Sequence, residues 1–173
     1  LYLKGTGWAY KEPWGSIQDA VYTDLTSFKN QPFKVNLTEQ VGDYIWYRGT
    51  LLNGKTVWIQ AGNVFSLPES NTSMLGHIQD QNAKIYKTIG DPSTSITAGT
   101  TYTKKVFYIK KQAELAGEHY YLLSRNAKNT DVIGWVKAKD VWAQNHVTID
   151  KKEKLLYLKG TGWAYTNPWG SVQ

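Results

Sequence analysis

The sequence predicts an all-β protein made of two tandem, small, partly open barrels of short antiparallel strands, with little or no helix. Aromatic side chains make up 14% of the chain, including 8 Trp and 12 Tyr, and flat rings suit the thin core of a short-stranded fold. Turn residues separate a succession of strand-like segments. Five or six such strands in about 65 to 80 residues are typical of a small barrel.

The first half of the chain contains the clearest hairpin. Residues 41–52 are rich in aromatic and β-branched side chains and predict one strand. Asn53-Gly54 follows, a dipeptide that strongly favours a tight hairpin turn. Residues 55–60 then supply the returning strand.

The second half is read in the same way. Strands are expected at residues 104–111, 118–124 and 134–137, with a loop at 126–131 in place of the tight turn. Short 3₁₀ turns are expected to join strands at residues 61–64 and 138–141. Helix signals are weak, and those at Glu39, 114–118 and 138–141 support at most one turn each.

A long internal repeat points to recognition rather than catalysis. Residues 1–18 (LYLKGTGWAYKEPWGSIQ) return at residues 156–173 as LYLKGTGWAYTNPWGSVQ, with fifteen of eighteen positions identical at an offset of 155 (156 minus 1). Such a period marks a tandem array. Arrays gain avidity on extended ligands, because several weak contacts act on one polymer.

A second period divides the repeat into two modules. VWIQAGNVF at residues 57–65 matches GWVKAKDVW at 134–142, an offset of 77 (134 minus 57), while Ile-Gln-Asp at 17–19 recurs at 78–80, an offset of 61 (78 minus 17). We interpret these matches as a first module at 1–70 and a second, basic module at 71–150 that is longer by sixteen residues (77 minus 61). Residues 151–173 form a linker and the start of the next repeat.

Charge is concentrated in the second half. The net charge is +6, of which residues 1–77 contribute zero (6 basic, 6 acidic) and residues 78–155 contribute +5 (13 basic, 8 acidic). This asymmetry predicts an anionic partner that touches mainly the second module. We expect no nucleic acid partner, because the first module is neutral and the chain has only two arginines, Arg48 and Arg125.

The sequence lacks the residues that disulfides, metal sites and common catalytic sites require. The chain has no cysteine, which excludes disulfides, thiolate nucleophiles and cysteine-bound zinc. His77, His119 and His146 stand apart without metal-ligand spacing, and Glu114 and Glu118 flank a probable hairpin turn rather than a pocket. We therefore expect no catalytic residue, metal or cofactor. No apolar stretch reaches eighteen residues, so no transmembrane segment is expected either.

The segment Gly134-Trp135-Val136-Lys137-Ala138-Lys139-Asp140-Val141, after an aromatic strand and a turn, resembles the GW module. Residues 5–18 resemble the segment that opens each paired repeat of Gram-positive bifunctional autolysins, and the likeness covers nearly the whole chain. It implies SH3-like barrels that bind lipoteichoic acid or a neighbouring anionic wall polymer. Such modules hold a secreted amidase/glucosaminidase at the cell wall, and the likeness implies no catalytic residue here. One departure is Val57, which stands where the first module should have the dipeptide's glycine.

The candidate binding residues fall into three groups. Polyanion contacts are predicted at lysines of the second module: Lys84, Lys87, Lys104, Lys105, Lys110, Lys111, Lys137 and Lys139. An aromatic groove or a module interface is predicted at Trp8, Tyr10, Trp14, Tyr47 and Tyr121. Trp58, Gly134 and Trp135 are interpreted as core and motif positions, with large rings anchoring each small barrel.

Other functions stay open at this point. An SH3-like groove could recognise a peptidoglycan peptide or cross-bridge, and adhesion to a host ligand is a further alternative. The chain is expected to be monomeric.

Overall fold

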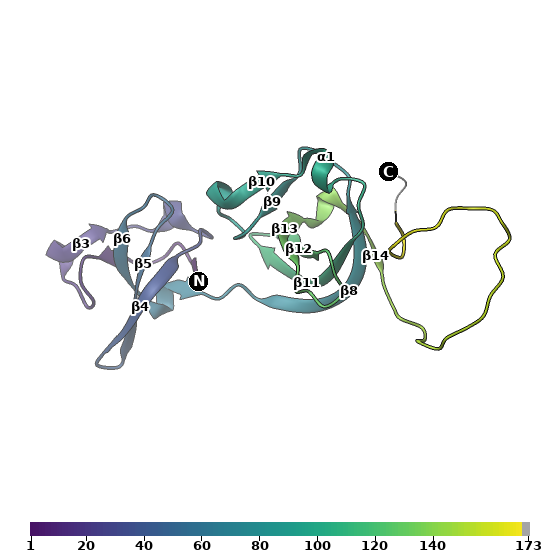
Figure 1. The fold of residues 1–173 in the computed structure, drawn as a ribbon. Helices are drawn as coiled ribbons and strands as arrows, with labels where there is room; N and C mark the ends of the chain where they lie inside the picture. The colour runs from purple at the N-terminus through teal and green to yellow at the C-terminus, as the bar shows by residue number, and fades with distance from the viewer. Residues whose placement is uncertain (171–173) are drawn as a thin grey trace. The chain divides into compact units, whose positions relative to one another are not determined.

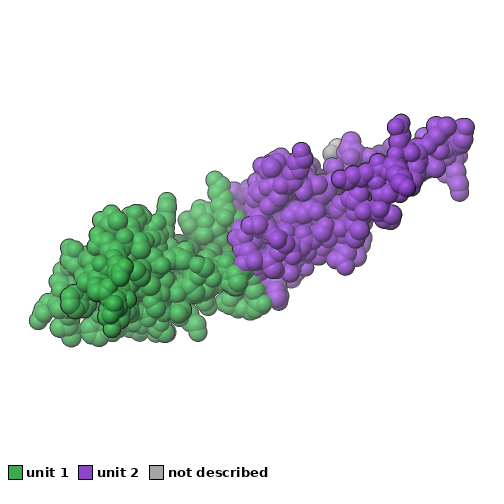
Figure 2. Space-filling view, turned by 90° about the horizontal axis from the view of Figure 1, so that it is seen from below, with its two compact units in different colours: residues 1–68, 86–95, 114–117 green, residues 69–85, 96–113, 118–173 purple. Residues whose placement is uncertain are grey.

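The computed structural model describes residues 1–170 and is mostly β, with antiparallel sheets and one short α-helix (Figure 1). The predicted fold class is confirmed. The chain forms two compact units, coloured separately in Figure 2. Unit 1 comprises residues 1–68, 86–95 and 114–117, and unit 2 comprises residues 69–85, 96–113 and 118–173.

Unit 1 contains a five-stranded sheet of order β3-β2-β6-β5-β4 and a two-stranded sheet of order β1-β7. Its strands are β1 (Tyr2–Leu3), β2 (Ala9–Tyr10), β3 (Ala20–Tyr22), β4 (Lys34–Val41), β5 (Tyr44–Thr50), β6 (Thr56–Gln60) and β7 (Val64–Phe65). Three 3₁₀ turns connect them: η1 (Ile17–Asp19), η2 (Thr26–Phe28) and η3 (Ala61–Asn63).

The predicted Asn-Gly hairpin is confirmed. Thr50 pairs with Thr56 across it, and Gly54 takes a φ of +83°, which glycine adopts without strain. The preceding strand is shorter than predicted, because Gly42 and Asp43 form a second hairpin turn between β4 and β5. The prediction of one strand across residues 41–52 was therefore wrong at its start, and Glu39 lies on β4 rather than in a helical turn.

The core of unit 1 is formed by apolar side chains from its strands and from the loops that cross them. Phe33 is 1% exposed and lies against the backbone of Gly49, where an added Cβ would sit 2.7 Å from the Phe33 ring. The remaining members are Leu3, Ala9, Leu25, Leu51, Val57, Ile59 and Val64.

Most of the second half of the chain forms a seven-stranded sheet of order β10-β9-β13-β12-β11-β8-β14. Its strands are β8 (Glu69–Ile78), β9 (Lys84–Tyr86), β10 (Ser95–Thr97), β11 (Phe107–Leu115), β12 (Glu118–Ser124), β13 (Val132–Lys137) and β14 (Val141–Asn145). The helix α1 (Gly99–Tyr102) and the 3₁₀ turns η4 (Pro92–Thr94) and η5 (Ala138–Asp140) complete it. The core cluster comprises Ile78, Ala83, Ile85, Ala98, Phe107, Ile109, Leu123, Val136 and Val141.

Local predictions for the second half are partly confirmed. The strand at 118–124, the loop at 126–131 and the 3₁₀ turn after Lys137 all occur. The strand predicted at 104–111 begins only at Phe107. The weak helix signal at 114–118 is instead a hairpin, in which Ala116 and Gly117 both take positive φ values (55° and 80°), as a two-residue I′ turn requires.

The Gly-Trp dipeptide of the second module lies at an irregularity in the sheet. Gly134 takes a φ of +148°, and the register between β12 and β13 shifts beside it, between Leu123 and Ser124. In the first module, β5 and β6 pair without a shift, and Val57 has no positive φ. The backbone therefore requires glycine in one module and accepts valine in the other.

Strand pairing also reveals which positions of the two modules correspond. Leu3 pairs with Val64 just after η3, and Ile78 pairs with Val141 just after η5. The offsets are 75 (78 minus 3) and 77 (141 minus 64), so the modules are nearly equal in length up to this point. Matching the two Ile-Gln-Asp segments was wrong, and so was the sixteen-residue extension deduced from it. The reason is that Ile17–Asp19 forms the 3₁₀ turn η1, whereas Ile78 ends strand β8.

Candidate functional site

Two exposed lysines among the predicted binding residues lie next to each other on a turn immediately before β11. Thr103 anchors this turn, since its side chain is buried and its hydroxyl donates to the carbonyl of Gly99 at 2.9 Å. Lys104 then takes a φ of +58°, a left-handed conformation that is uncommon outside glycine. Lys104 and Lys105 are both exposed, so the turn presents two adjacent cations to solvent.

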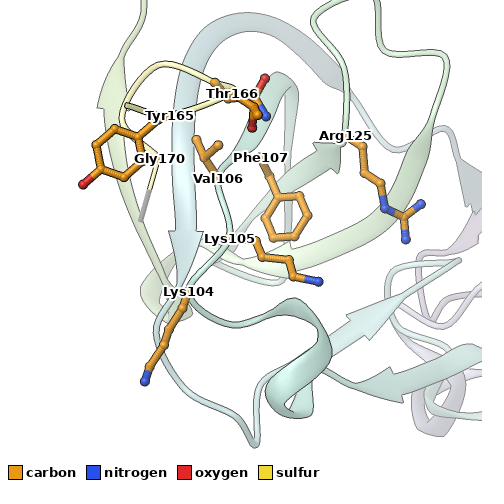
Figure 3. Close-up of a pocket in the computed structure, with 9 residues that line it drawn as sticks. Lys104, Lys105, Val106, Phe107, Arg125, Tyr165, Thr166 and Gly170 are labelled. Carbon is orange, nitrogen blue, oxygen red and sulfur yellow. The ribbon is translucent and has the colours of Figure 1, made fainter. Parts of the chain in front are cut away.

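This turn borders a shallow pocket of about 300 Å³ in unit 2. Figure 3 shows Lys104 and Lys105 extending in different directions, with Arg125 on a separate segment and Tyr165 on the part of the chain that begins the next repeat. The described residues that line it are Lys104, Lys105, Val106, Phe107, Arg125, Tyr165, Thr166, Asn167 and Gly170. Three of these nine side chains are cationic, and none of the nine is a carboxylate.

The three cations differ in how far their charge is already neutralised. Arg125 donates to the Asp131 carboxylate at 2.9 Å and lies 5.9 Å from the centre of the Tyr102 ring. Lys104 and Lys105 make no ion pair within residues 1–170. Their charge is therefore available to an anionic ligand. Arg125 was missed as a site residue, because nothing in its sequence neighbourhood predicts that its loop lies near residues 104 and 105.

Lys137 and Lys139 form a second basic group, at η5, and share one carboxylate. The Lys137 ammonium lies 2.8 Å from Glu118 and the Lys139 ammonium 3.9 Å from it. The hydrogen bond from Lys137, then its charge, and then the charge of Lys139 hold the pKa of Glu118 below its ordinary value. Glu118 thus stays ionised in mildly acidic solution and partly masks both lysines.

The other predicted lysines are dispersed. Lys111 pairs with Glu69 at 2.8 Å, and Lys110 donates to the Ser73 hydroxyl at 3.1 Å, both reaching from β11 to β8. Lys84 donates to the Thr97 hydroxyl at 2.7 Å. Lys87 is exposed and belongs to unit 1. The eight lysines therefore do not form one continuous row along a strand. Lys104 and Lys105 lie on a turn, whereas Lys110 and Lys111 lie on β11.

Unit 1 contains a separate aromatic cleft. Trp8 stacks on Tyr10 at a centroid distance of 6.2 Å, and Tyr10 meets Trp46 edge to face at 5.7 Å. These rings, with Gly7, Gln60 and Asn63, line a cleft of about 280 Å³. The indole nitrogen of Trp46 is buried and has no hydrogen-bond acceptor within the described chain. Trp46 was not predicted, although it lies between Tyr44 and Tyr47 on the same strand.

Among the other predicted aromatic residues, Trp14 is 70% exposed, whereas the rest are partly or fully buried. Tyr47 and Tyr121, which were predicted for the groove or interface, are partly buried and pack against the two core clusters. Trp58 is 5% exposed and Trp135 is 8% exposed, as expected of rings that anchor each barrel. The Arg48 guanidinium lies 5.9 Å from the centre of the Trp58 ring and covers its outer side.

Within residues 1–170, no three His, Asp or Glu side chains gather closely enough to hold a metal ion. No helix in the described chain is long and apolar enough to cross a membrane.

Comparison with known families identifies the modules. The GW (Gly-Tryp) dipeptide domain matches twice, at residues 4–65 and 69–142, which together cover most of the chain. The chain belongs to the GW dipeptide domain family. It is therefore two SH3-like GW domains in tandem, as the resemblance implied.

The related proteins are autolysins. The bifunctional autolysins of Staphylococcus aureus strains Mu50, N315 and NCTC 8325 are each 26% identical to this chain over 188 residues. The alignment covers 95% of this chain but only 14% of the staphylococcal protein. A crystal structure of a putative autolysin from Listeria monocytogenes aligns with a TM-score of 0.38 and 20% identity, over 80% of this chain and 59% of that one.

These relationships place the GW repeats with the repeat region of autolysins. That is consistent with cell-wall binding and suggests a location at the cell surface. The aligned portion consists of GW repeats, and no catalytic domain is seen in it.

Proposed function

We propose that this GW repeat anchors a secreted murein hydrolase, an amidase/glucosaminidase, to the bacterial surface by binding lipoteichoic acid or a related anionic wall polymer. The observation that carries the proposal is the exposed pair Lys104 and Lys105, which have no carboxylate partner within residues 1–170 and lie beside Arg125. Flexible lysines on a polyphosphate give contacts that are weak singly. A tandem array multiplies them into useful avidity.

The direct test is a pull-down on purified lipoteichoic acid at increasing salt. Binding should weaken steadily from 0.05 to about 0.5 M NaCl, because exposed charges are screened over shorter distances as ionic strength rises. Absence of binding, or binding that salt does not change, would contradict the proposal.

A second candidate function is recognition of peptidoglycan, either its peptide cross-bridge or its glycan. The aromatic cleft of Trp8, Tyr10 and Trp46 favours it, because neighbouring rings offer flat apolar faces on which a sugar or a peptide side chain can pack. The same experiment separates the two functions. Binding to murein stripped of teichoic acids, with none to lipoteichoic acid, would support peptidoglycan recognition and contradict binding of the anionic polymer.

Glu118 offers a variant that should strengthen polymer binding. Glu118→Gln removes the carboxylate that masks Lys137 and Lys139, so affinity for lipoteichoic acid at pH 7 should rise by about two- to fivefold, the size of one exposed ion pair. The native chain should gain the same increase only when pH falls through the lowered pKa of Glu118, where the carboxylate becomes neutral. The measurement is a set of binding isotherms for the native chain and Glu118→Gln, at pH 7 and at successively lower pH values until the two chains bind equally.

A matched control is Glu69→Gln, which frees Lys111 from an equally short ion pair. A stronger effect at Glu118 than at Glu69 would assign the η5 lysines to the binding surface. Unchanged affinity in Glu118→Gln would remove Lys137 and Lys139 from it.

A further inference from the structure

The start of the second repeat copy returns to the second module and contacts it through one tryptophan. The Trp169 ring meets the Trp142 ring edge to face at 4.6 Å and the His77 ring at 4.7 Å. The backbone carbonyl of Trp169 lies 2.9 Å from His77 Nε2, within hydrogen-bond distance. Residues 146–159 carry no regular secondary structure, and Figure 1 shows this segment leaving β14 and coming back beside it. The last three residues of the copy lie outside the described chain.

Trp169 sits on a turn that has the same shape in both copies of the lead-in. Trp14 and Trp169 each take a left-handed φ of 57°. In each copy the following glycine lies under a tyrosine, such that a Cβ on Gly15 or Gly170 would sit 2.7 Å from the ring of Tyr10 or Tyr165. The first copy is built into unit 1 through β1 and β2, whereas residues 156–165 form no strand. The turn therefore forms without the module that follows it, and it presents the tryptophan in a fixed orientation.

The two tryptophans differ in what covers them. Trp169 is half-buried, while Trp14 is 70% exposed. A tryptophan held in a left-handed turn with most of its ring in water loses conformational freedom and gains little burial. That combination is expected where a partner surface covers the ring.

The surface that Trp169 contacts occupies an equivalent place in both modules. His77 and Trp142 are directly opposed on β8 and β14, and Tyr2 and Phe65 are opposed in the same way on β1 and β7. In unit 1, the Tyr2 hydroxyl donates to the carbonyl of Ile89 at 3.0 Å, so this ring pair also receives a chain segment that follows the module in sequence. The ring pair is thus the place where each module contacts the chain that comes after it.

We propose that the Pro-Trp-Gly turn at the start of each repeat is a latch that docks on the ring pair of the second module in the repeat before it. Trp169 occupies that position on His77 and Trp142. Trp14 belongs to the same kind of latch, and its docking site is the corresponding ring pair of a preceding copy of this repeat. The latch fixes the geometry of successive repeats through a contact that forms without bound polymer.

One consequence rests on the proposed function. The latch brings Tyr165, Thr166 and Asn167 to the edge of the basic pocket that contains Lys104. The pocket is therefore completed by the repeat that follows, so a polymer site lies at each junction between repeats.

The test compares Trp169→Ala with Trp14→Ala in the full 173-residue chain, using ¹⁵N relaxation. In the native chain, residues 165–170 should relax as part of unit 2, with order parameters near 0.85. Trp169→Ala should lower these to below about 0.6. Trp14→Ala makes the same chemical change on an identical turn and should leave residues 165–170 unaltered. Trp142→Ala, at a half-exposed side chain, should release the segment as Trp169→Ala does.

Three outcomes would overturn the latch. One is a native segment that is already mobile, and another is a Trp169→Ala segment that stays rigid. The third is a contact whose signals depend on protein concentration, which would place Trp169 on another molecule. Unchanged amide shifts for core residues such as Ile109 confirm that each variant is folded. Because relaxation is measured without polymer, failure of the latch and failure of polymer binding are told apart.

Discussion

Replacing Phe33 with alanine is expected to lower the free energy of unfolding by about 3–5 kcal/mol, the usual cost of truncating a fully buried phenylalanine. Phe33 is 1% exposed and contacts the Gly49 backbone at the centre of the unit 1 core. The neighbouring strands cannot readily close the gap, because the pairing of Val35 with Gly49 holds β4 to β5 next to Phe33. Small domains have only about 5–15 kcal/mol of stability, so the loss should be visible as a large drop in the urea midpoint.

The same contact can be tested from the opposite side. Gly49→Ala places a methyl group 2.7 Å from the Phe33 ring and 2.8 Å from the Lys34 carbonyl, so it should destabilise by about 1–3 kcal/mol through overpacking. Trp14→Ala, at an exposed ring, is the matched aromatic control and should change the midpoint little. Equal losses for Phe33→Ala and Trp14→Ala would show that the packing assigned to Phe33 is wrong.

The second large effect is expected on ligand binding. Lys104→Asn with Lys105→Gln removes both unpaired cations of the basic pocket, and asparagine tolerates the left-handed backbone at position 104. Affinity for lipoteichoic acid should fall by about three- to tenfold, since each exposed lysine contributes only a fraction of 1 kcal/mol. The slope of affinity against salt concentration should fall as well, because fewer charges take part. Binding isotherms at two or three salt concentrations measure both quantities.

The control has the same change in net charge. Lys151→Gln with Lys152→Gln alters two exposed lysines of the segment after β14. If binding depends on overall charge alone, the two double variants will weaken it equally, and the pocket is then not the polymer-binding site. A selective loss at 104 and 105 would support the pocket and locate the polymer on it.

Local sequence signals predicted those elements whose geometry depends on a few adjacent residues. Asn53-Gly54 specified a hairpin because the turn needs a left-handed residue at position 54, which glycine supplies without strain. The 3₁₀ turns after Gln60 and Lys137 were likewise predictable from a pattern that occurs in both modules. The Gly42-Asp43 turn was missed, because the surrounding aromatic and β-branched residues resemble one uninterrupted strand.

The candidate site was less predictable, because charge alone does not reveal which lysines are already paired. Lys111, Lys137 and Lys139 all have carboxylate partners that are distant in sequence, whereas Lys104 and Lys105 have none in the described chain. The left-handed turn at Lys104 was not predictable, because this position has no glycine or asparagine, the residues that usually adopt that conformation. His77 and Trp142 were also missed as a surface, since only the β8–β14 register places them opposite each other.

By itself, the sequence determined that this protein is a β-rich tandem repeat with a basic second half and a repeated tryptophan turn. Periodicity, turn residues and net charge are properties of the chain order, so they can be read without coordinates. Only the tertiary structure decided which cations remain available and where the repeated tryptophan rests. Both depend on contacts between residues far apart in the chain, and the pairing of strands, which no local pattern encodes, sets those contacts.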